Sequence, residues 1–185
     1  MTRRPLSIAL AVLVALALGA CGHKTDTVTR GESEASYVTL GHLQYQVQLS
    51  RQLNASDVGD RDYLVGLSPG DRTLKGTEVW FAVWVRVYNK SGSGQRSADS
   101  FKIVDTRGRG YQPIPQSAVN RFAYRPAPVA DQSRLPLPGS AADGTPTSGA
   151  MLLFKLPVDA LDFRPLELAF SSAGAPAEST IRLDV

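Results

Sequence analysis

Residues 78–88 read EVWFAVWVRVY, and this stretch decides the fold class of the chain. Successive side chains of a β-strand point to opposite faces, so the four valines of this stretch share one face with Phe81. The other face begins with Trp80, Ala82 and Trp84, which are also apolar. A strand that is apolar on both faces belongs inside a sheet whose second face is covered by another part of the chain. We therefore expect Trp80 and Trp84 to be core residues.

Several other segments show a β pattern. Residues 43–49 (LQYQVQL) alternate apolar and polar side chains at every position, which is typical of a strand with one solvent-facing side. The further candidate strands are 63–67, which is the weakest, 101–105, 150–157, 165–170 and 179–185. Turn-forming residues separate these segments, and no long helical pattern follows the N-terminal segment. About seven such strands favour an all-β, antiparallel, immunoglobulin-like sandwich.

The N-terminal segment has the features of a secretory signal peptide. Arg3 and Arg4 precede an unbroken apolar stretch over residues 8–18. This stretch has about a dozen residues, whereas a membrane-spanning helix needs roughly twenty. We therefore expect the segment to be removed rather than to serve as a permanent anchor. The arginine pair is also compatible with twin-arginine export, so the sequence leaves the export route open.

The signal segment ends in Leu18-Gly19-Ala20-Cys21, which resembles the lipobox of bacterial lipoproteins at each position. The resemblance implies that a signal peptidase recognises Leu18, Gly19 and Ala20, that it cleaves before Cys21, and that the Cys21 thiol is acylated. One acyl chain binds a bilayer only marginally, whereas two or three chains hold a protein permanently. We predict a lipoprotein signal peptide over residues 1–20. The mature protein is expected at the cell membrane, lipid-anchored on the extracytoplasmic face.

Composition predicts how the mature chain is divided. Residues 21–36 are polar and nearly free of large apolar side chains, so they cannot bury enough surface to offset the entropy lost on ordering. We interpret them as the lipidated cysteine and a flexible tether, and we place the folded domain at residues 37–185. Within the domain, residues 112–149 are rich in proline and glycine and read as one long loop, with at most one helical turn over 117–123. A loop of this length in a compact domain is unusual and is often functional.

Charge and cysteine content restrict the partners. Two of the 20 basic residues lie within residues 1–20, which leaves 18 basic against 17 acidic residues in the mature chain. A nucleic-acid-binding domain needs a strongly basic surface, so we expect no nucleic-acid partner. Cys21 is the single cysteine of the chain, so its acylation leaves no thiol for a disulfide.

No residue pattern points to a catalytic or metal site. His23 in the tether and His42 at the start of the first strand are isolated, whereas zinc sites use three or four protein ligands. The densest group of carboxylates comprises Asp57, Asp60, Asp62 and Asp71. We interpret this group as a solvated loop, and a carboxylate-dependent hydrolase is the alternative, because paired acids are set by spatial separation. We expect no catalytic residue, no metal and no cofactor.

The best candidates for partner contact lie in the proline-rich segment: Arg121, Phe122, Tyr124 and Arg125. Aromatic residues and arginine are enriched at binding hot spots. The alternative is that these side chains fold back over the second face of the strand that carries Trp84.

Four features follow one another along the chain: a strand over 79–88 that ends in Asn89, a strand over 101–105 that leads to Tyr111, LLFKLP at 152–157 and LEL at 166–168. This order is similar to the telokin-like, immunoglobulin-like domains of bacterial surface lipoproteins, over roughly residues 38–185. The segment 124–149 departs from that compact pattern. The resemblance implies two packed sheets and no catalytic residues, and most members have no known function.

Together these features predict a lipid-anchored, non-enzymatic binding or structural module of the bacterial cell envelope. Its partners would be the membrane, through the lipid on Cys21, and an unknown protein or envelope component. The alternative function is a carrier that holds a small apolar ligand between its sheets.

Overall fold

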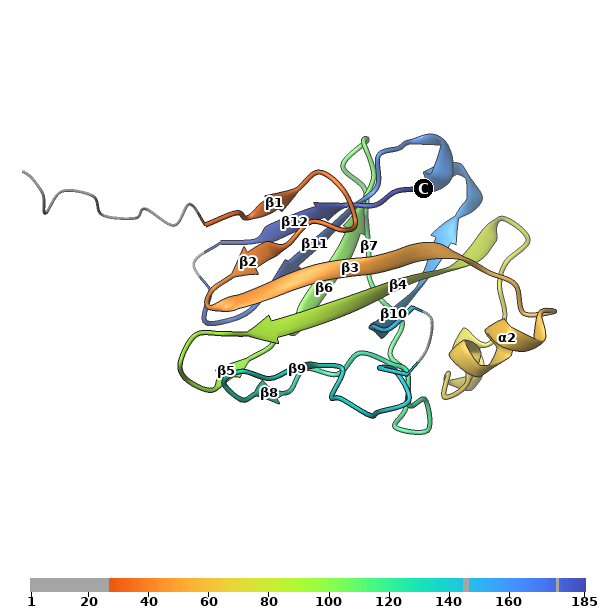
Figure 1. Cartoon of the computed structure of the whole chain (residues 1–185). Coiled ribbons are helices and arrows are strands. Elements are labelled where there is room, and N and C mark those ends of the chain that lie inside the picture. Colours follow the sequence, from red (N-terminus) through yellow and green to blue (C-terminus); the bar gives the residue numbers. More distant parts are fainter. Residues whose placement is uncertain (1–26, 145–146, 176) are drawn as a thin grey trace, which may run out of the picture.

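The computed structural model describes residues 27–144, 147–175 and 177–185. The chain forms two sheets that face each other across one core (Figure 1), which confirms the expected all-β sandwich. No helix in these ranges is long and apolar enough to cross a membrane. The predicted signal peptide and its recognition residues, Leu18, Gly19 and Ala20, lie outside the described residues, as does Cys21.

The first sheet has the strand order β1-β12-β11-β6-β7. Its strands are β1 (Arg30–Gly31), β12 (Ser179–Arg182), β11 (Glu167–Ser171), β6 (Ser100–Val104) and β7 (Gly110–Tyr111). The second sheet has the order β10-β4-β3-β2, and β9 also pairs with β4. Its strands are β10 (Ala150–Pro157), β4 (Glu78–Asn89), β3 (Leu43–Leu53), β2 (Val38–Leu40) and β9 (Arg134–Leu135). The remaining elements are β5 (Gln95–Arg96), β8 (Pro128–Val129), the helix α2 (Val58–Arg61) and the 3-10 turns η2 (Asp62–Leu64), η3 (Pro69–Asp71) and η4 (Val158–Asp162).

β4 lies inside the second sheet and is buried on both faces, as its sequence predicts. Phe81 and the valines after it pack in the core between the two sheets. Trp80, Ala82 and Trp84 face the other way and form a second cluster on the outer side of the sheet. We call this second group the tryptophan cluster. Both tryptophans are at most 3% exposed, so they are core residues as expected.

The segment that covers the tryptophan cluster was expected to contain a strand at 63–67, and this expectation is wrong. The side chain of Asp57 accepts a hydrogen bond from the Gly59 N–H and caps α2, after which the chain continues as η2. Helical turns place Tyr63 edge to face on Trp84, with ring centroids 5.2 Å apart. The apolar side chains of this segment therefore serve as a lid over the second sheet rather than as a further strand.

A β-bulge in β3 changes the side to which its residues point. Val47 pairs with Val85 and Leu49 pairs with Trp84, so Gln48 is an extra residue between two registers. One inserted residue moves every later side chain to the opposite face of the sheet. Side chains before the bulge enter the core between the sheets, and those beyond it reach the tryptophan cluster; the two groups are Leu43, Tyr45 and Val47, and Leu49 and Leu53.

The folded domain begins before its predicted start at residue 37. β1 lies inside the predicted tether and pairs in parallel with β12. The Thr39 N–H donates to the Val28 carbonyl at 2.6 Å, and the Thr180 N–H donates to the Thr29 carbonyl at 2.9 Å. Backbone pairing, which needs no apolar side chain, holds this polar segment in the sheet, so its composition gave no sign of order.

A buried carboxylate further ties residues 28–36 to the sandwich. Glu34 is 8% exposed, and its carboxylate accepts hydrogen bonds from the Ser50 hydroxyl, from the Ser50 N–H at 3.2 Å and from the Asp184 N–H at 3.1 Å. Ser50 follows the bulge in β3, and Asp184 follows β12. Glu34 therefore links the N-terminal segment, the second sheet and the C-terminal segment.

The predicted long loop over residues 112–149 contains two short strands. β8 pairs with β5, and β9 pairs with the end of β4. Arg134 in β9 donates to both carboxylate oxygens of Asp143, at 2.9 and 3.1 Å. Residues 117–123 form turns rather than the helical turn that the sequence allowed, because the Asn120 side chain accepts from the Phe122 N–H at 2.9 Å.

Strand pairing defines two ends of the sandwich. Leu43 at the start of β3 pairs with Asn89 at the end of β4, and Arg30 in β1 pairs with Thr180 in β12. The end where the chain enters the fold, which we call the entry end (Figure 1), therefore contains the β2–β3 turn (residues 41–42), loop 90–94 and the described residues between β11 and β12, 172–175 and 177–178. The helix α2 lies at the opposite end, which we call the far end.

Candidate binding groove

Tyr124, one of the four predicted contact residues, is a core residue. Its side chain is 9% exposed and its ring packs edge to face on Phe101, with centroids 4.8 Å apart. Its hydroxyl donates to the Ala98 carbonyl at 2.9 Å, and the Ala98 N–H donates to the Tyr45 hydroxyl at 2.7 Å. Burial raises the pKa of Tyr124, so the hydroxyl stays protonated. The two tyrosines thus hold both polar groups of Ala98 inside the sandwich.

Removal of the Tyr124 hydroxyl tests this structural role. We expect Tyr124→Phe to lower the free energy of unfolding by about 1 kcal/mol, because the buried Ala98 carbonyl loses its hydrogen-bond donor. Arg121→Ala, at an exposed position in the same segment, should leave that free energy within about 0.5 kcal/mol. Urea unfolding of both variants makes the measurement. An equal effect of the two substitutions would contradict the assignment of Tyr124 to the core.

The other three predicted contact residues lie in different environments. Phe122 is half-buried, and its ring lies 5.1 Å from that of Tyr63, so it extends the cover over the tryptophan cluster. Arg125 donates to the carbonyls of Gln116 at 3.1 Å and Ser117 at 2.6 Å, which closes the loop. Arg121 is exposed, with its guanidinium 5.9 Å from the centre of the Phe122 ring. Of the four, Arg121 and Arg125 are exposed and Phe122 is partly exposed, whereas Tyr124 is buried.

The proline-rich loop runs beside the outer edge of β10 and is attached to it at two places. The Ile114 N–H donates to the Leu153 carbonyl at 2.7 Å. Eight residues later, the Met151 N–H donates to the Phe122 carbonyl and the Tyr124 N–H donates to the Met151 carbonyl, both at 2.7 Å. The two attachments are only two residues apart on β10, so loop residues 115–121 bulge away from the strand between them.

A groove of about 320 Å³ lies between the two attachments. Its wall is formed by residues of the loop, of β10 and of β6, namely Asp99, Phe101, Pro113, Ile114, Pro115, Gln116, Ala123, Tyr124, Arg125, Pro126, Met151, Leu152 and Leu153. Most of these residues are apolar, and Asp99, Gln116 and Arg125 supply polar groups. Ligand sites commonly measure about 300–1,000 Å³ and combine apolar walls with a few polar groups.

Prolines and side-chain amides explain why the loop stands away from β10. Proline has no N–H to donate to a strand edge, and its ring fixes φ, so Pro113, Pro115 and Pro126 prevent regular pairing. The side chains of Gln116 and Asn120 donate to the Tyr63 carbonyl at 2.8 and 3.0 Å. The loop is thus held against the lid of the tryptophan cluster, and the groove stays open.

A second hollow adjoins the groove. It measures about 540 Å³ and shares Pro115 and Gln116 with the groove, and it is also lined by Gly66, Leu67, Ser68, Arg72, Ser117 and Val119. Val119 is 77% exposed and Val65 is 39% exposed. The loop therefore presents an apolar surface on both sides of Pro115 and Gln116. The sequence marked the segment 112–149 as unusual, but it did not single out these residues.

The acidic residues near α2 do not converge on one site. Asp57 caps α2, and Asp71 accepts from the Ser68 hydroxyl at 2.7 Å. Asp60 accepts from Arg51 at 3.1 Å and from the Asn54 N–H at 2.8 Å, and the hydrogen bond from Arg51 lowers its pKa. Asp62 is exposed at the start of η2. Among the described residues, no three His, Cys, Asp or Glu side chains come close enough to hold a metal ion.

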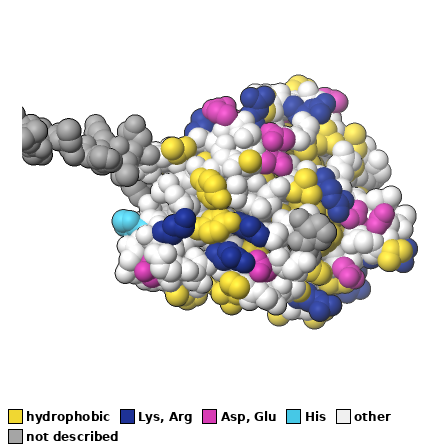
Figure 2. Space-filling view, in the orientation of Figure 1, with side chains coloured by type: hydrophobic (Ala, Val, Ile, Leu, Met, Phe, Trp, Pro, Cys, Tyr) yellow, Lys and Arg dark blue, Asp and Glu magenta, His cyan; other side chains and the backbone are white. Residues whose placement is uncertain are grey.

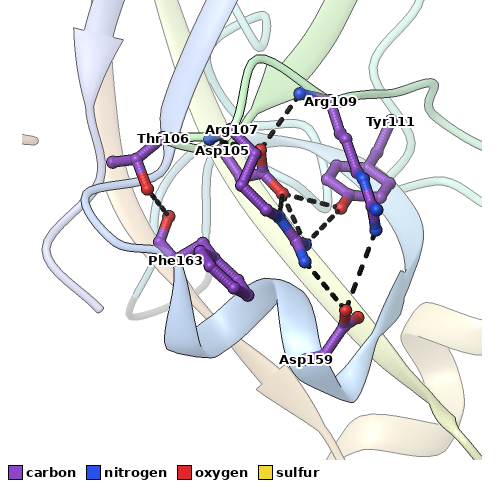
Figure 3. A network of polar contacts seen from close by, with 7 residues as sticks. All are labelled: Asp105, Thr106, Arg107, Arg109, Tyr111, Asp159 and Phe163. Carbon is purple, nitrogen blue, oxygen red and sulfur yellow. Dashed lines mark hydrogen bonds and ion pairs between the residues drawn. The ribbon is translucent and has the colours of Figure 1, made fainter.

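A buried carboxylate organises the β6–β7 hairpin (Figure 3). Asp105 accepts hydrogen bonds from the Arg107 N–H at 2.9 Å, the Arg107 guanidinium at 2.7 Å, the Arg109 N–H at 3.0 Å and the Tyr111 hydroxyl at 3.0 Å. Burial by itself raises the pKa of Asp105, but these hydrogen bonds outweigh it and lower the pKa to about 2. The strand pattern over residues 101–105 predicted β6 and gave no sign of this network.

Arg107 connects the hairpin to η4. Its guanidinium donates to Asp159 at 2.9 Å and lies 3.6 Å from the centre of the Phe163 ring. The Thr106 N–H and hydroxyl both reach the Phe163 carbonyl at 3.1 Å. The Asp105 carboxylate is fully occupied by groups of its own chain, so we assign it a structural role.

No protein-family model matches the chain, and no curated protein matches its sequence. The structure is similar to that of the YjhA protein from Bacillus subtilis, with a TM-score of 0.55 and 11% identity over 83% of this chain and 99% of that chain. It is also similar to the secreted protein MPT63 from Mycobacterium tuberculosis, with a TM-score of 0.48 and 13% identity over 87% of this chain and 100% of that chain. An uncharacterized β-sandwich protein from Clostridium difficile 630 matches with a TM-score of 0.41 and 8% identity, over 82% of this chain and 93% of that chain. The similarity to YjhA shows that the chain has the same β-sandwich fold.

Proposed function

We propose that this protein is a lipid-anchored, extracytoplasmic binding module of the bacterial cell envelope that works without catalysis. Its binding site is the groove between the proline-rich loop and β10. The occupant is an apolar segment of another envelope component, held by the apolar wall and oriented by the exposed carboxylate of Asp99.

The groove is the observation that carries this proposal. It is built by the segment that is unusually long for a compact domain, and the cost of ordering that segment is met by specific contacts. The loop is held in place by hydrogen bonds that the side chains of Arg125, Gln116 and Asn120 donate to backbone carbonyls. A loop that served only to connect two strands would not need this support.

The two alternatives have less support among the described residues. A carrier needs an enlarged apolar cavity between the sheets, whereas the side chains there form one continuous packed cluster. A hydrolase needs two carboxyl groups facing one cleft. The described wall of the groove contains one carboxylate, Asp99, and the acidic residues near α2 hold local turns.

The anchor is tested with the full chain produced in a bacterial host. We expect intact mass to show a lipid-sized increase on Cys21 and the protein to partition with membranes. Cys21→Ser should lose both properties, because the acylated thiol is missing. An unmodified, freely soluble product of the original sequence in a host that processes lipoproteins would refute the anchor.

The groove is tested separately, by cross-linking in the native envelope. A photo-reactive residue replaces exposed Pro126 in the groove or exposed Val58 in α2, which lies outside it. We expect the variant at Pro126 to give one discrete adduct that the variant at Val58 does not give. The same adducts at both positions, or no adduct at Pro126, would argue against a binding role for the groove.

A further inference from the structure

We infer that the entry end of the sandwich faces the bilayer that holds Cys21, with Val28 and Tyr37 at the level of the lipid headgroups. This inference rests on the proposed lipid anchor and goes beyond it, because it assigns one surface of the domain to the membrane. The far end and its helix α2 then point away from the lipid.

The length of the chain between the anchor and the fold limits the orientations of the domain. Val28 is the first of the described residues with a backbone hydrogen bond to the sandwich, and residues 22–27 separate it from Cys21. The seven residue-to-residue steps from Cys21 to Val28 span at most about 25 Å when fully extended. A tether over all of the predicted residues 22–36 would span roughly 50 Å and would allow any orientation.

The length of the sandwich determines which of its ends can reach the bilayer. β4 has 12 residues, so it runs roughly 40 Å from one end of the sandwich to the other. To bring the far end to the bilayer, the tether would have to run along the whole domain, which is well beyond its reach of about 25 Å. The short tether therefore keeps the entry end next to the lipid that holds Cys21.

The exposed side chains near the point of entry suit a lipid surface. Val28 is 49% exposed and Tyr37 is 52% exposed, and the Tyr37 ring lies 5.8 Å from the ring of Tyr88. Tyrosine is enriched where membrane and water meet, since its ring is apolar and its hydroxyl is polar. Figure 2 shows hydrophobic side chains flanked by Lys and Arg on the face that carries β3 and β4.

The charges at the entry end do not oppose an anionic surface. Lys90 and Arg96 are exposed in and after loop 90–94. Glu178 forms an ion pair with Lys102 at 2.9 Å, and Asp131 accepts a hydrogen bond from the Gly92 N–H at 2.9 Å. These two carboxylates are thus engaged within the protein. Asp99 is also exposed and lines the same hollow as His42 and Arg96, so Lys90 and Arg96 leave a small excess of positive charge for the phosphate groups of lipids.

The orientation can be measured by fluorescence quenching with lipidated full-length protein in vesicles. One new cysteine is introduced and labelled, either His42→Cys in the β2–β3 turn or Val58→Cys in α2; acylated Cys21 does not react. Both positions are exposed and lie at opposite ends of the sandwich. A quencher attached to the headgroups of a fraction of the lipids acts over short distances. We expect several-fold stronger quenching at position 42 than at position 58.

A longer tether supplies the matched control. Insertion of 15 Gly and Ser residues after Gly22 should bring the quenching at the two positions close together, while flotation with the vesicles stays unchanged. Tyr37→Ser should weaken quenching at position 42 with the original tether. Equal quenching at both positions, or stronger quenching at position 58, with the original tether would overturn the inference. A protein without a lipid-sized mass or without flotation would instead refute the anchor itself, and the inference with it.

Discussion

Asp105→Asn should lower the free energy of unfolding by about 3 kcal/mol, because it removes the charge from a buried hydrogen-bonded ion pair and leaves Arg107 with its surface pair to Asp159 but without its buried partner. The asparagine amide has nearly the shape of the carboxylate, so packing is kept. One of its two acceptor oxygens is replaced by an NH₂ group that faces the donors of Arg107 and Tyr111. A loss of this size is a large part of the 5–15 kcal/mol that stabilises a typical domain. Urea unfolding at neutral pH provides the measurement.

Acid titration and a neighbouring carboxylate provide the controls for Asp105. Its pKa is lowered in the folded state from an ordinary value of 3.8 to about 2. Its contribution to stability is therefore complete above about pH 4 and is lost as the pH falls through about 2. Asp105→Asn should lack this part of the acid dependence. Asp159→Asn, whose side chain is 52% exposed, should cost less than 1 kcal/mol. A cost at Asp159 equal to that at Asp105 would place the main contribution at the surface pair instead.

Trp84→Ala should lower the free energy of unfolding by about 4 kcal/mol, the range measured when a large buried aromatic side chain is truncated in a core. Trp84 is fully buried, contacts Tyr63 edge to face, and lies 5.4 Å from the Arg51 guanidinium. Its removal leaves a cavity under the lid formed by Tyr63 and Phe122. The segment around α2 should then become more accessible to hydrogen exchange than the core between the sheets.

Two further substitutions separate packing from other effects at Trp84. The indole Nε1 makes no hydrogen bond within the described residues, so Trp84→Phe removes volume and no buried hydrogen bond. We expect it to cost less than half as much as Trp84→Ala. Val58→Ala, in the exposed helix α2, should stay within about 0.5 kcal/mol. If Trp84→Ala cost no more than Val58→Ala, the outer face of the second sheet would not need its lid.

The sequence predicts the position of β4 well, because the apolar pattern on each of its two faces is formed by residues close together in the chain. Its Phe81 face and its Trp80 face are read directly from alternating residues, and both are buried as expected. The alternation over residues 43–49 also predicts β3. It fails beyond Val47, because the bulge at Gln48 depends on how β3 pairs with β4 rather than on the identity of its side chains.

The sequence predicts which segment forms the candidate site, but it does not predict which residues of that segment lie on the surface. Proline content marked residues 112–149 as unusual, and the groove lies there. The aromatic ring of Tyr124 is typical of a contact residue, but its hydroxyl reaches Ala98, which is 26 positions earlier in the chain, and the ring is buried. Phe122 covers the tryptophan cluster, in agreement with the alternative that these side chains fold back over the strand of Trp84. Residues that contact a partner and residues that cover a core are of the same types, so only their neighbours in the folded structure distinguish the two roles.

The sequence by itself determined that the chain is all-β, that β4 is buried on both faces, and that Leu18 to Cys21 resemble a lipidation site. These properties depend on residues that are adjacent in the chain, so periodicity and short motifs record them. The tertiary structure alone decided that residues 28–36 join the sandwich, that 63–67 forms a lid, and that β10 is bordered by a groove. Each of these depends on backbone groups and buried polar side chains that meet across long stretches of chain, and no local pattern specifies which partner they find.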